Sequence, residues 1–247
     1  MQDKTIIITG AAGEIGFATA QKFAEAGANV MLVDVDEDNL QTRANELNTD
    51  KVAYQVADVT KEDDVKAYVQ ATLDRFGSIH YFFNNAGIEG KVAPVHETDM
   101  QVFDQVMQVN VYGVALGMKH VMPAMEEGGS IVITSSVAGL MGTPGMLPYI
   151  TSKHATIGIM RVAALEGAER KIRVNTVHPG VIDSRMMESL ESGMGDQQEV
   201  HSMFEQQVPL KRYGQEAEVA DMVYFLLSDQ ASYCTGQTYV LDGGILL

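Results

Sequence analysis

The chain has 247 residues, with 17 Lys or Arg against 33 Asp or Glu, which gives a formal net charge of −16. A surface this acidic repels nucleic acid and anionic membranes, and no apolar run reaches the ~18 residues of a membrane span. The composition therefore excludes both kinds of partner, and the length fits a single domain over residues 1–247.

Short apolar runs alternate with longer stretches of helical periodicity along the chain. We predict strands near residues 4–9, 29–34, 51–57, 79–84, 130–135, 172–177 and 237–241. We predict helices near residues 14–27, 37–47, 61–76, 99–126, 149–169 and 216–228. This alternation is typical of an α/β fold in which helices cover both faces of a parallel sheet. Ligands of such folds bind beyond the carboxyl ends of the strands.

The turn after the first predicted strand is rich in glycine and opens a helix. Gly10, Gly13 and Gly16 would let the backbone approach a pyrophosphate closely, and the start of the helix favours its negative charge. An ordinary tight turn would not require an acidic residue at the end of the next strand. Asp34 lies there, where a ribose-binding carboxylate belongs, so the pattern predicts a dinucleotide site.

Tyr149 and Lys153 stand four residues apart at the start of a predicted helix, and Ser136 follows an apolar strand. Alone, this spacing is also typical of a solvated helix face. On one face of a helix, the Lys ammonium would favour the phenolate and lower the pKa of Tyr149 from about 10. Tyr149 could then exchange a proton with a carbonyl or alcohol oxygen, which Ser136 would hydrogen-bond.

Together these features resemble the short-chain dehydrogenase/reductase family. The matching segments, which span nearly the whole chain, are residues 9–16, 58–59, 84–87, 110, 136, 149–153, 179–180, 235–237 and 242–244. The resemblance implies a single-domain, Rossmann-type, doubly wound parallel sheet of about seven strands in the order 3-2-1-4-5-6-7. It also implies hydride transfer between a nicotinamide cofactor and a secondary alcohol or ketone.

The resemblance also assigns roles to individual residues. The catalytic residues would be Asn110, Ser136, Tyr149 and Lys153, with Asn110 holding a water that links Lys153 to bulk solvent. The cofactor contacts would be Gly10, Gly13, Ile15, Gly16, Asp34, Asp58, Val59, Asn85, Ala86, Gly87, Tyr149, Lys153, Pro179, Gly180, Val181 and Ser184. In this assignment Asp58 binds the adenine amino group, although it could instead cap the following helix.

The cofactor is expected to be NAD rather than NADP. Asp34 can accept hydrogen bonds from both ribose hydroxyls, but it would repel the additional phosphate of NADP. Gly13 offers no side chain for that phosphate, and the helical position of Arg43 favours a surface residue. Glu14 departs from the family pattern, which usually has glycine there, and a carboxylate beside the pyrophosphate would cost affinity unless it points elsewhere.

Residues 185–208 occupy the position of the family's substrate lid. The apolar side chains in this segment are Met186, Met187, Leu190, Met194, Met203 and Phe204. Methionines can form an adaptable apolar pocket, but two amphipathic helices packed on the body would show the same pattern. We expect a small, fairly apolar secondary alcohol or ketone as the substrate, with cyclic compounds among the candidates.

Two other functions stay open. A 3-oxoacyl-(acyl-carrier-protein) reductase would need a basic surface to receive its acidic carrier, and Glu126 and Glu127 disfavour such a surface. A non-catalytic dinucleotide-binding sensor could share the fold. The presence of Asn110, Ser136, Tyr149 and Lys153 together disfavours that function.

The remaining expectations concern assembly, metals and location. By resemblance, the chain forms a homotetramer through the helices near 99–126 and 149–169 and through the last strand. Val102, Val106, Val109 and Leu116 have the spacing of an interface, although they could equally face the sheet. The six histidines are scattered, so no metal site is expected. Cys234 is the only cysteine, and the chain begins without a signal-peptide pattern, so we expect a cytoplasmic protein.

Overall fold

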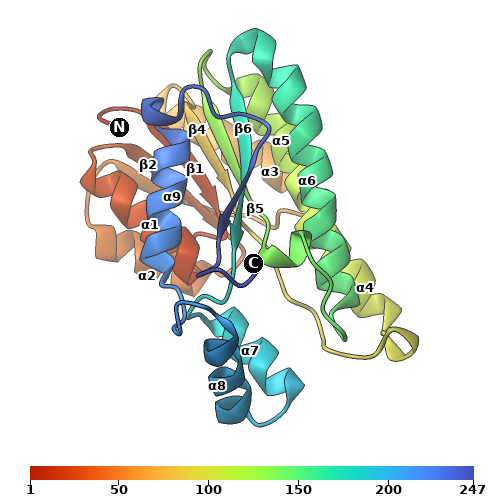
Figure 1. Ribbon diagram of the computed structural model, residues 1–247. Coiled ribbons are helices and arrows are strands. Elements are labelled where there is room, and N and C mark those ends of the chain that lie inside the picture. The colour runs from red at the N-terminus through yellow and green to blue at the C-terminus, as the bar shows by residue number, and fades with distance from the viewer.

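The structure, a computed structural model, describes all residues 1–247 and is built around one parallel sheet (Figure 1). The strands are β1 (Thr5–Thr9), β2 (Asn29–Asp34), β3 (Val52–Val56), β4 (Tyr81–Asn84), β5 (Ser130–Thr134), β6 (Arg173–Pro179) and β7 (Thr238–Leu241). Their order in the sheet is β3-β2-β1-β4-β5-β6-β7. The predicted fold class and strand order are therefore confirmed.

The central strands form because they are apolar on both faces. In β1, Ile6, Ile7 and Ile8 are fully buried, and the strand pairs in parallel with both β2 and β4. A continuous run of β-branched residues suits a strand that is covered by helices above and below. Ile7 belongs to the apolar core on one side of the sheet, and Ile6 and Ile8 belong to the core on the other side.

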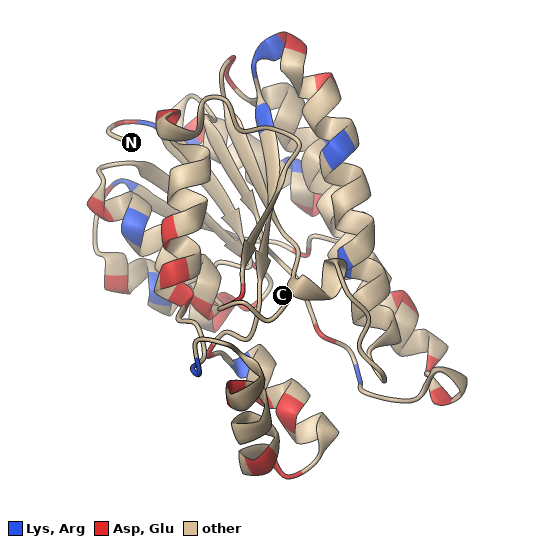
Figure 2. Ribbon diagram, in the orientation of Figure 1, with Lys and Arg blue, Asp and Glu red and all other residues tan.

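Helices form a layer on each face of the sheet (Figure 1). One layer contains α1 (Glu14–Glu25), α2 (Glu37–Leu47) and α9 (Glu216–Leu227). The other contains α3 (Glu62–Phe76), α5 (Val114–Ala124) and α6 (Leu147–Gly167), and α4 (Met100–Met107) packs against α6. Acidic residues are spread over both layers (Figure 2). None of the helices has the combined length and hydropathy of a membrane span.

The long helix predicted over 99–126 is interrupted. A π-helical segment, Gln108–Gly113, separates α4 from α5. Its wider turn places Gly113 against β3's following loop, where a Cβ on Gly113 would lie 2.8 Å from a methyl group of Val59. Single-turn π segments occur mostly at functional sites. Here the segment contains Asn110, one of the predicted catalytic residues.

The segment over residues 185–208 contains two helices, α7 (Arg185–Met194) and α8 (Gln197–Gln207). The element prediction placed no helix in this segment, although its apolar spacing allowed a pair of amphipathic helices. Ser184 caps α7 and Asp196 caps α8 through side-chain hydrogen bonds to backbone N–H groups. The α7–α8 segment extends from the body at the carboxyl edge of the sheet (Figure 1).

Candidate active site

A cavity of about 890 Å³ opens at the carboxyl edge of the sheet, and the α7–α8 segment contributes part of its wall. It has the size of a site for a large organic ligand. The predicted site residues that line it are Gly10, Gly13, Ile15, Gly16, Asp34, Asn85, Ala86, Gly87, Ser136, Tyr149, Lys153, Pro179, Gly180, Val181 and Ser184. Asn110, Asp58 and Val59 are predicted residues that do not line it.

The glycine turn forms a bare backbone cradle at the start of α1. Gly10 has a φ of +66°, and a Cβ there would lie 2.9 Å from the Cα of Ala86. A Cβ on Gly16 would lie 2.2 Å from the carbonyl oxygen of Gly10, so no larger residue fits. The residue before α1, Gly13, makes no side-chain cap, which leaves the helix start accessible to an anion. This arrangement fits a pyrophosphate group.

Asp34, the last residue of β2, lines the cavity directly beside the glycine turn. Its carboxylate accepts hydrogen bonds from the backbone N–H groups of Ala12 at 3.0 Å, Val35 at 2.8 Å and Asp36 at 3.1 Å. These bonds fix the carboxylate, which retains acceptor capacity toward the cavity because a carboxylate has about four lone-pair sites. Hydroxyl groups of a ribose fit this acceptor.

Three further side chains that were not predicted to line the cavity lie near Asp34. Asp36, Asn39 and Arg43 also line the cavity. Arg43 is a partly exposed residue, as expected, and its side chain also lines the cavity. Its guanidinium lies 4.3 Å from the ring centroid of Phe17 and donates a hydrogen bond to Glu46. This face of α2 is therefore the one that meets the cavity.

Asp58 lies outside the cavity and makes local contacts. Its carboxylate accepts hydrogen bonds from the backbone N–H and the hydroxyl of Thr60, at 3.0 and 2.7 Å, and pairs with Lys61. These are the contacts of a local turn before α3 and not of a helix cap, because the N-cap residue of α3 is Lys61 and no side chain caps that helix. Val59 packs against Gly113.

Ser136, Tyr149 and Lys153 meet in the middle of the cavity and are 8%, 7% and 3% exposed. Tyr149 and Lys153 lie one turn apart in α6, and the Nζ of Lys153 is 5.5 Å from the tyrosine ring centroid. Nζ donates to the carbonyl of Thr134 at 3.0 Å. The loop after β5 brings Ser136 to this point, where its Oγ accepts a bond from the N–H of Ala138.

The pKa of Tyr149 differs from the expectation. Burial raises it to about 12, while a hydrogen bond from Ser136 acts in the opposite direction and the charge of Glu89 adds to the rise. Burial also lowers the pKa of Lys153 to about 8. The predicted lowering of the tyrosine pKa is thus wrong for this structure, because removal from water opposes the charged form of both groups.

Asn110 does not line the cavity but binds the backbone of a segment beside it. Its side chain accepts a hydrogen bond from the N–H of Ile88 and donates to the carbonyl of Ile88, both at 2.8 Å, and it also donates to the hydroxyl of Ser152. A Cβ on the neighbouring Gly87 would lie 3.2 Å from Asn110 and 3.4 Å from Nζ of Lys153. Asn110 therefore holds the segment that passes directly beside the lysine.

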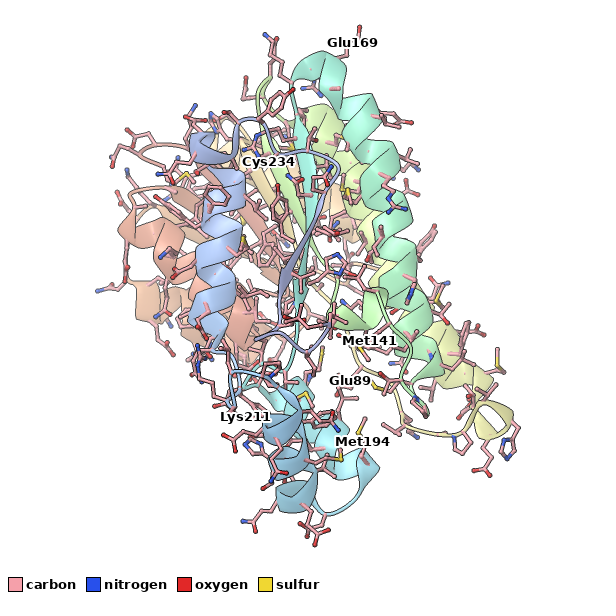
Figure 3. All side chains as sticks on the ribbon, in the orientation of Figure 1. Glu89, Met141, Glu169, Met194, Lys211 and Cys234 are labelled. Carbon is pink, nitrogen blue, oxygen red and sulfur yellow. The ribbon has the colours of Figure 1, made fainter.

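The wall opposite the glycine cradle is apolar. Met141 and Met146 come from the loop before α6, and Met186, Met187 and Met194 come from α7. Figure 3 labels Met141 on the body and Met194 on α7. The sulfur of Met186 lies 3.9 Å from the Tyr149 hydroxyl. Of the apolar lid side chains considered in the sequence, Met203 alone does not line the cavity.

Two acidic residues connect the body to the start of α7. Glu14 accepts a hydrogen bond from the backbone N–H of Arg185 at 3.4 Å, so its carboxylate points away from the glycine cradle toward α7. The Arg185 guanidinium pairs with Glu89, whose side chain is 11% exposed. Glu89 is labelled near the opening in Figure 3. No group of three or more His, Cys, Asp or Glu residues has an arrangement that could hold a metal ion.

A doubly wound sheet with a phosphate cradle, a ribose acceptor and a buried Tyr-Lys pair at one edge defines a dinucleotide-dependent oxidoreductase. A family profile described as enoyl-(acyl carrier protein) reductase matches residues 10–246. The crystal structure of levodione reductase superposes with a TM-score of 0.95 and 39% identity, covering 99% of this chain and 98% of that one. The chain therefore belongs to the short-chain dehydrogenase/reductase family.

Curated relatives agree with this assignment. Levodione reductase of Leifsonia aquatica is 40% identical, with 98% of this chain and 94% of the relative covered. Cyclohexanol dehydrogenase of Acinetobacter sp. (strain SE19) is 37% identical, with coverages of 98% and 94%. The 3-oxoacyl-[acyl-carrier-protein] reductase FabG of Thermotoga maritima is 38% identical, with coverages of 100% and 99%. These relatives are oxidoreductases that act on CH–OH groups or the corresponding ketones.

Proposed function

We propose that the protein is a NAD-dependent enzyme that interconverts a small, fairly apolar secondary alcohol, including cyclic ones, and its ketone. The observation that carries the proposal is the convergence of Ser136, Tyr149 and Lys153 between the glycine cradle and the methionine wall. The nicotinamide cofactor would accept or supply the hydride. The residues of the chain would bind the two reactants and move the proton.

In the reducing direction, Tyr149 would donate its phenolic proton to the carbonyl oxygen of the substrate. A raised pKa keeps this phenol protonated at neutral pH, which suits a proton donor. Ser136 would donate a second hydrogen bond to the same oxygen as its charge develops. The ammonium group of Lys153 would replace the proton that Tyr149 gives to the substrate. It has donors left for this, because it uses only one of its three N–H groups on the carbonyl of Thr134.

The preference for NAD is supported by Asp34. Its fixed carboxylate offers acceptors to the two hydroxyls of an adenosine ribose and would repel a phosphate on the same ribose. Arg43 also lines the cavity but already bonds Glu46 and stacks on Phe17. The helices α7 and α8 would serve as the substrate lid, with residues 185–208 closing the apolar side.

The substrate class is supported by the apolar wall and by the relatives. Thioether side chains from α7 and from the loop before α6 adapt to varied apolar shapes. Two relatives that match nearly the full chain are named for cyclohexanol and levodione. Cyclic alcohols and ketones are therefore the compounds to test first.

The test follows NADH absorbance while the protein is offered a panel of cyclic ketones, secondary alcohols and diols. Turnover of at least one compound is expected, with a loss of about 10²-fold or more in Tyr149→Phe because the proton donor is removed. Tyr112→Phe is the matched control, since Tyr112 is 49% exposed and lies on the π-helical segment. Equal turnover by Tyr149→Phe and the parent enzyme would refute the acid/base assignment.

A reductase of acyl groups on a carrier protein is the second candidate. The similarity to FabG of Thermotoga maritima favours it. The acidic balance of the chain opposes it, because a net charge of −16 would repel an acidic carrier protein. A 3-oxoacyl thioester in the same panel separates the two candidates. NADH binding without any turnover would instead indicate a sensor.

A homotetramer is part of the proposal. Of the four apolar residues whose orientation the sequence left open, Val106 and Leu116 are buried, and Val102 and Val109 are half-buried. Other apolar side chains are exposed on the same helices, with Val162 at 57% and Leu165 at 81% on α6. Val240 on the edge strand β7 is also exposed, and contacts between copies would cover these surfaces. The proposed location is the cytoplasm, in keeping with the lone free cysteine, Cys234.

A further inference from the structure

His178 is a buried ionisable residue that the proposed reaction does not use. It lies near the end of β6, directly before Pro179, and is fully buried. Its Nδ1 is 2.8 Å from the carbonyl oxygen of Ser136, and its Nε2 is 2.8 Å from the hydroxyl of Thr176. Both ring nitrogens therefore have a partner inside the protein.

The partners determine which nitrogen carries the proton. A backbone carbonyl can only accept a hydrogen bond, so Nδ1 of His178 must be the N–H donor to Ser136. Burial lowers the pKa of His178, opposed by its bond to Ser136 and reinforced by the charge of Lys153, so the ring is neutral at pH 7. Nε2 then accepts a hydrogen bond from the Thr176 hydroxyl.

The bond to His178 acts on the backbone of a proposed catalytic residue. The Ser136 carbonyl accepts one hydrogen bond from His178 and a second, at 2.8 Å, from the N–H of Gly139. The side chain of the same residue accepts from Ala138 at 3.1 Å and contacts the carbonyl of Pro179 at 3.4 Å. The preceding N–H, of Ser135, donates to the Val177 carbonyl of β6 at 2.9 Å, and the imidazole is the contact through which β6 holds the Ser136 carbonyl itself.

We propose that His178 is a positioning residue that acts through the Ser136 carbonyl and sets the direction of the Ser136 hydroxyl toward the substrate oxygen beside Tyr149. The proposal rests on the proposed function of Ser136. It differs from a simple packing role, because packing requires only the volume of the ring. A positioning role requires a protonated nitrogen at the place of Nδ1.

Three variants separate the two roles. His178→Leu keeps an apolar side chain but removes the donor, whereas His178→Asn keeps an amide N–H near the place of Nδ1. Thr176→Val perturbs the same buried ring but leaves the Nδ1 bond to Ser136 in place. We expect kcat to fall by about 10- to 100-fold in His178→Leu and to recover largely in His178→Asn. Thr176→Val should lower thermal stability with kcat close to that of the parent, and NADH affinity should stay unchanged in all three.

A double-mutant cycle with Ser136→Ala tests the route. Because His178 acts through Ser136, His178→Leu should cause no further loss of kcat when Ser136→Ala is already present. Multiplying losses, or equal losses in His178→Leu and His178→Asn, would overturn the proposal. If Ser136→Ala alone were as active as the parent, the proposed function of Ser136 would fail instead, so the two failures are distinguishable.

The parent protein offers a measurement that does not depend on the folding of any variant. Nitrogen-15 NMR of the histidine rings at pH 7 reports which nitrogen carries the proton. We expect His178 to show a protonated Nδ1 and an unprotonated Nε2. The opposite tautomer would leave the Ser136 carbonyl without its donor and would overturn the proposal.

Discussion

Replacement of Lys153 by Met should stabilise the protein at neutral pH while it abolishes turnover. Lys153 is 3% exposed, and burial lowers its pKa from 10.5 to about 8. Holding the ammonium form in the folded protein at pH 7 therefore costs ~3 kcal/mol relative to the unfolded chain. Loss of the bond to Thr134 offsets about 1–2 kcal/mol of the gain. Lys153→Met should thus be more stable than the parent by ~1–2 kcal/mol.

The sign of this difference depends on pH. The folded-state pKa of Lys153 lies below the unfolded-state value, so between about pH 8 and 10.5 the unfolded chain binds more protons. The stability of the parent therefore rises with pH through this window, and that of Lys153→Met does not share this rise. At pH 9.5 the parent should have gained ~2 kcal/mol relative to the variant, which removes or reverses the advantage seen at pH 7.

Urea unfolding followed by far-UV circular dichroism at pH 7 and pH 9.5 measures both differences, and NADH absorbance measures turnover. Lys91→Met is the matched control, because Lys91 is exposed and makes no hydrogen bond or ion pair. Its stability relative to the parent should be the same at both pH values. If the difference between Lys153→Met and the parent were also independent of pH, the buried ammonium would not be the cause.

Three further changes test other parts of the site. Asp34→Asn should raise the KM for NAD about 10-fold and shift the ratio of kcat/KM values toward NADP, because a charged acceptor becomes a neutral one; a parent that already prefers NADP would contradict this. Glu14→Gln should leave NADH affinity, measured by nucleotide fluorescence, within about twofold of the parent, since the carboxylate points toward α7 and away from the glycine cradle; a several-fold gain would contradict this orientation. Tyr213→Phe removes a 2.6 Å hydrogen bond to the buried Glu191 on α7 and should cost ~2 kcal/mol in thermal or urea unfolding, with no change expected if that bond contributes nothing.

The sheet was predictable because each strand can be recognised from its own local sequence. Runs such as Ile6–Ile8 are apolar at every position, and each ends at a turn or polar residue that marks the edge of the sheet. The glycine turn and Asp34 were predictable for a related reason. A close backbone approach requires glycine and a ribose contact requires a carboxylate at a strand end. Both requirements can be recognised in the sequence from residue type and spacing.

Other features depend on contacts between distant segments and leave no such trace. The π-helical segment Gln108–Gly113 has ordinary helical periodicity, and only the structure shows that the helix widens there and that Gly113 lies close to Val59. That Arg43 also lines the cavity was not predictable, because helical spacing alone does not say which face of α2 meets the cavity. The predicted shift of the Tyr149 pKa had the wrong direction, because i, i+4 spacing predicts proximity to Lys153 but not the burial of both groups.

The burial that disfavours the charged Lys153 also determines how the site would work. Because Ser136 and Tyr149 are nearly buried, a hydrogen bond from either to a partly negative oxygen would be screened less than in water and would be stronger. The same environment raises the pKa of Tyr149 and lowers that of Lys153, so both groups resist charge in the resting protein. Charge on the substrate oxygen and on Tyr149 would therefore appear and disappear together with proton transfer, whereas Lys153 keeps its ammonium charge at pH 7 at a cost in stability.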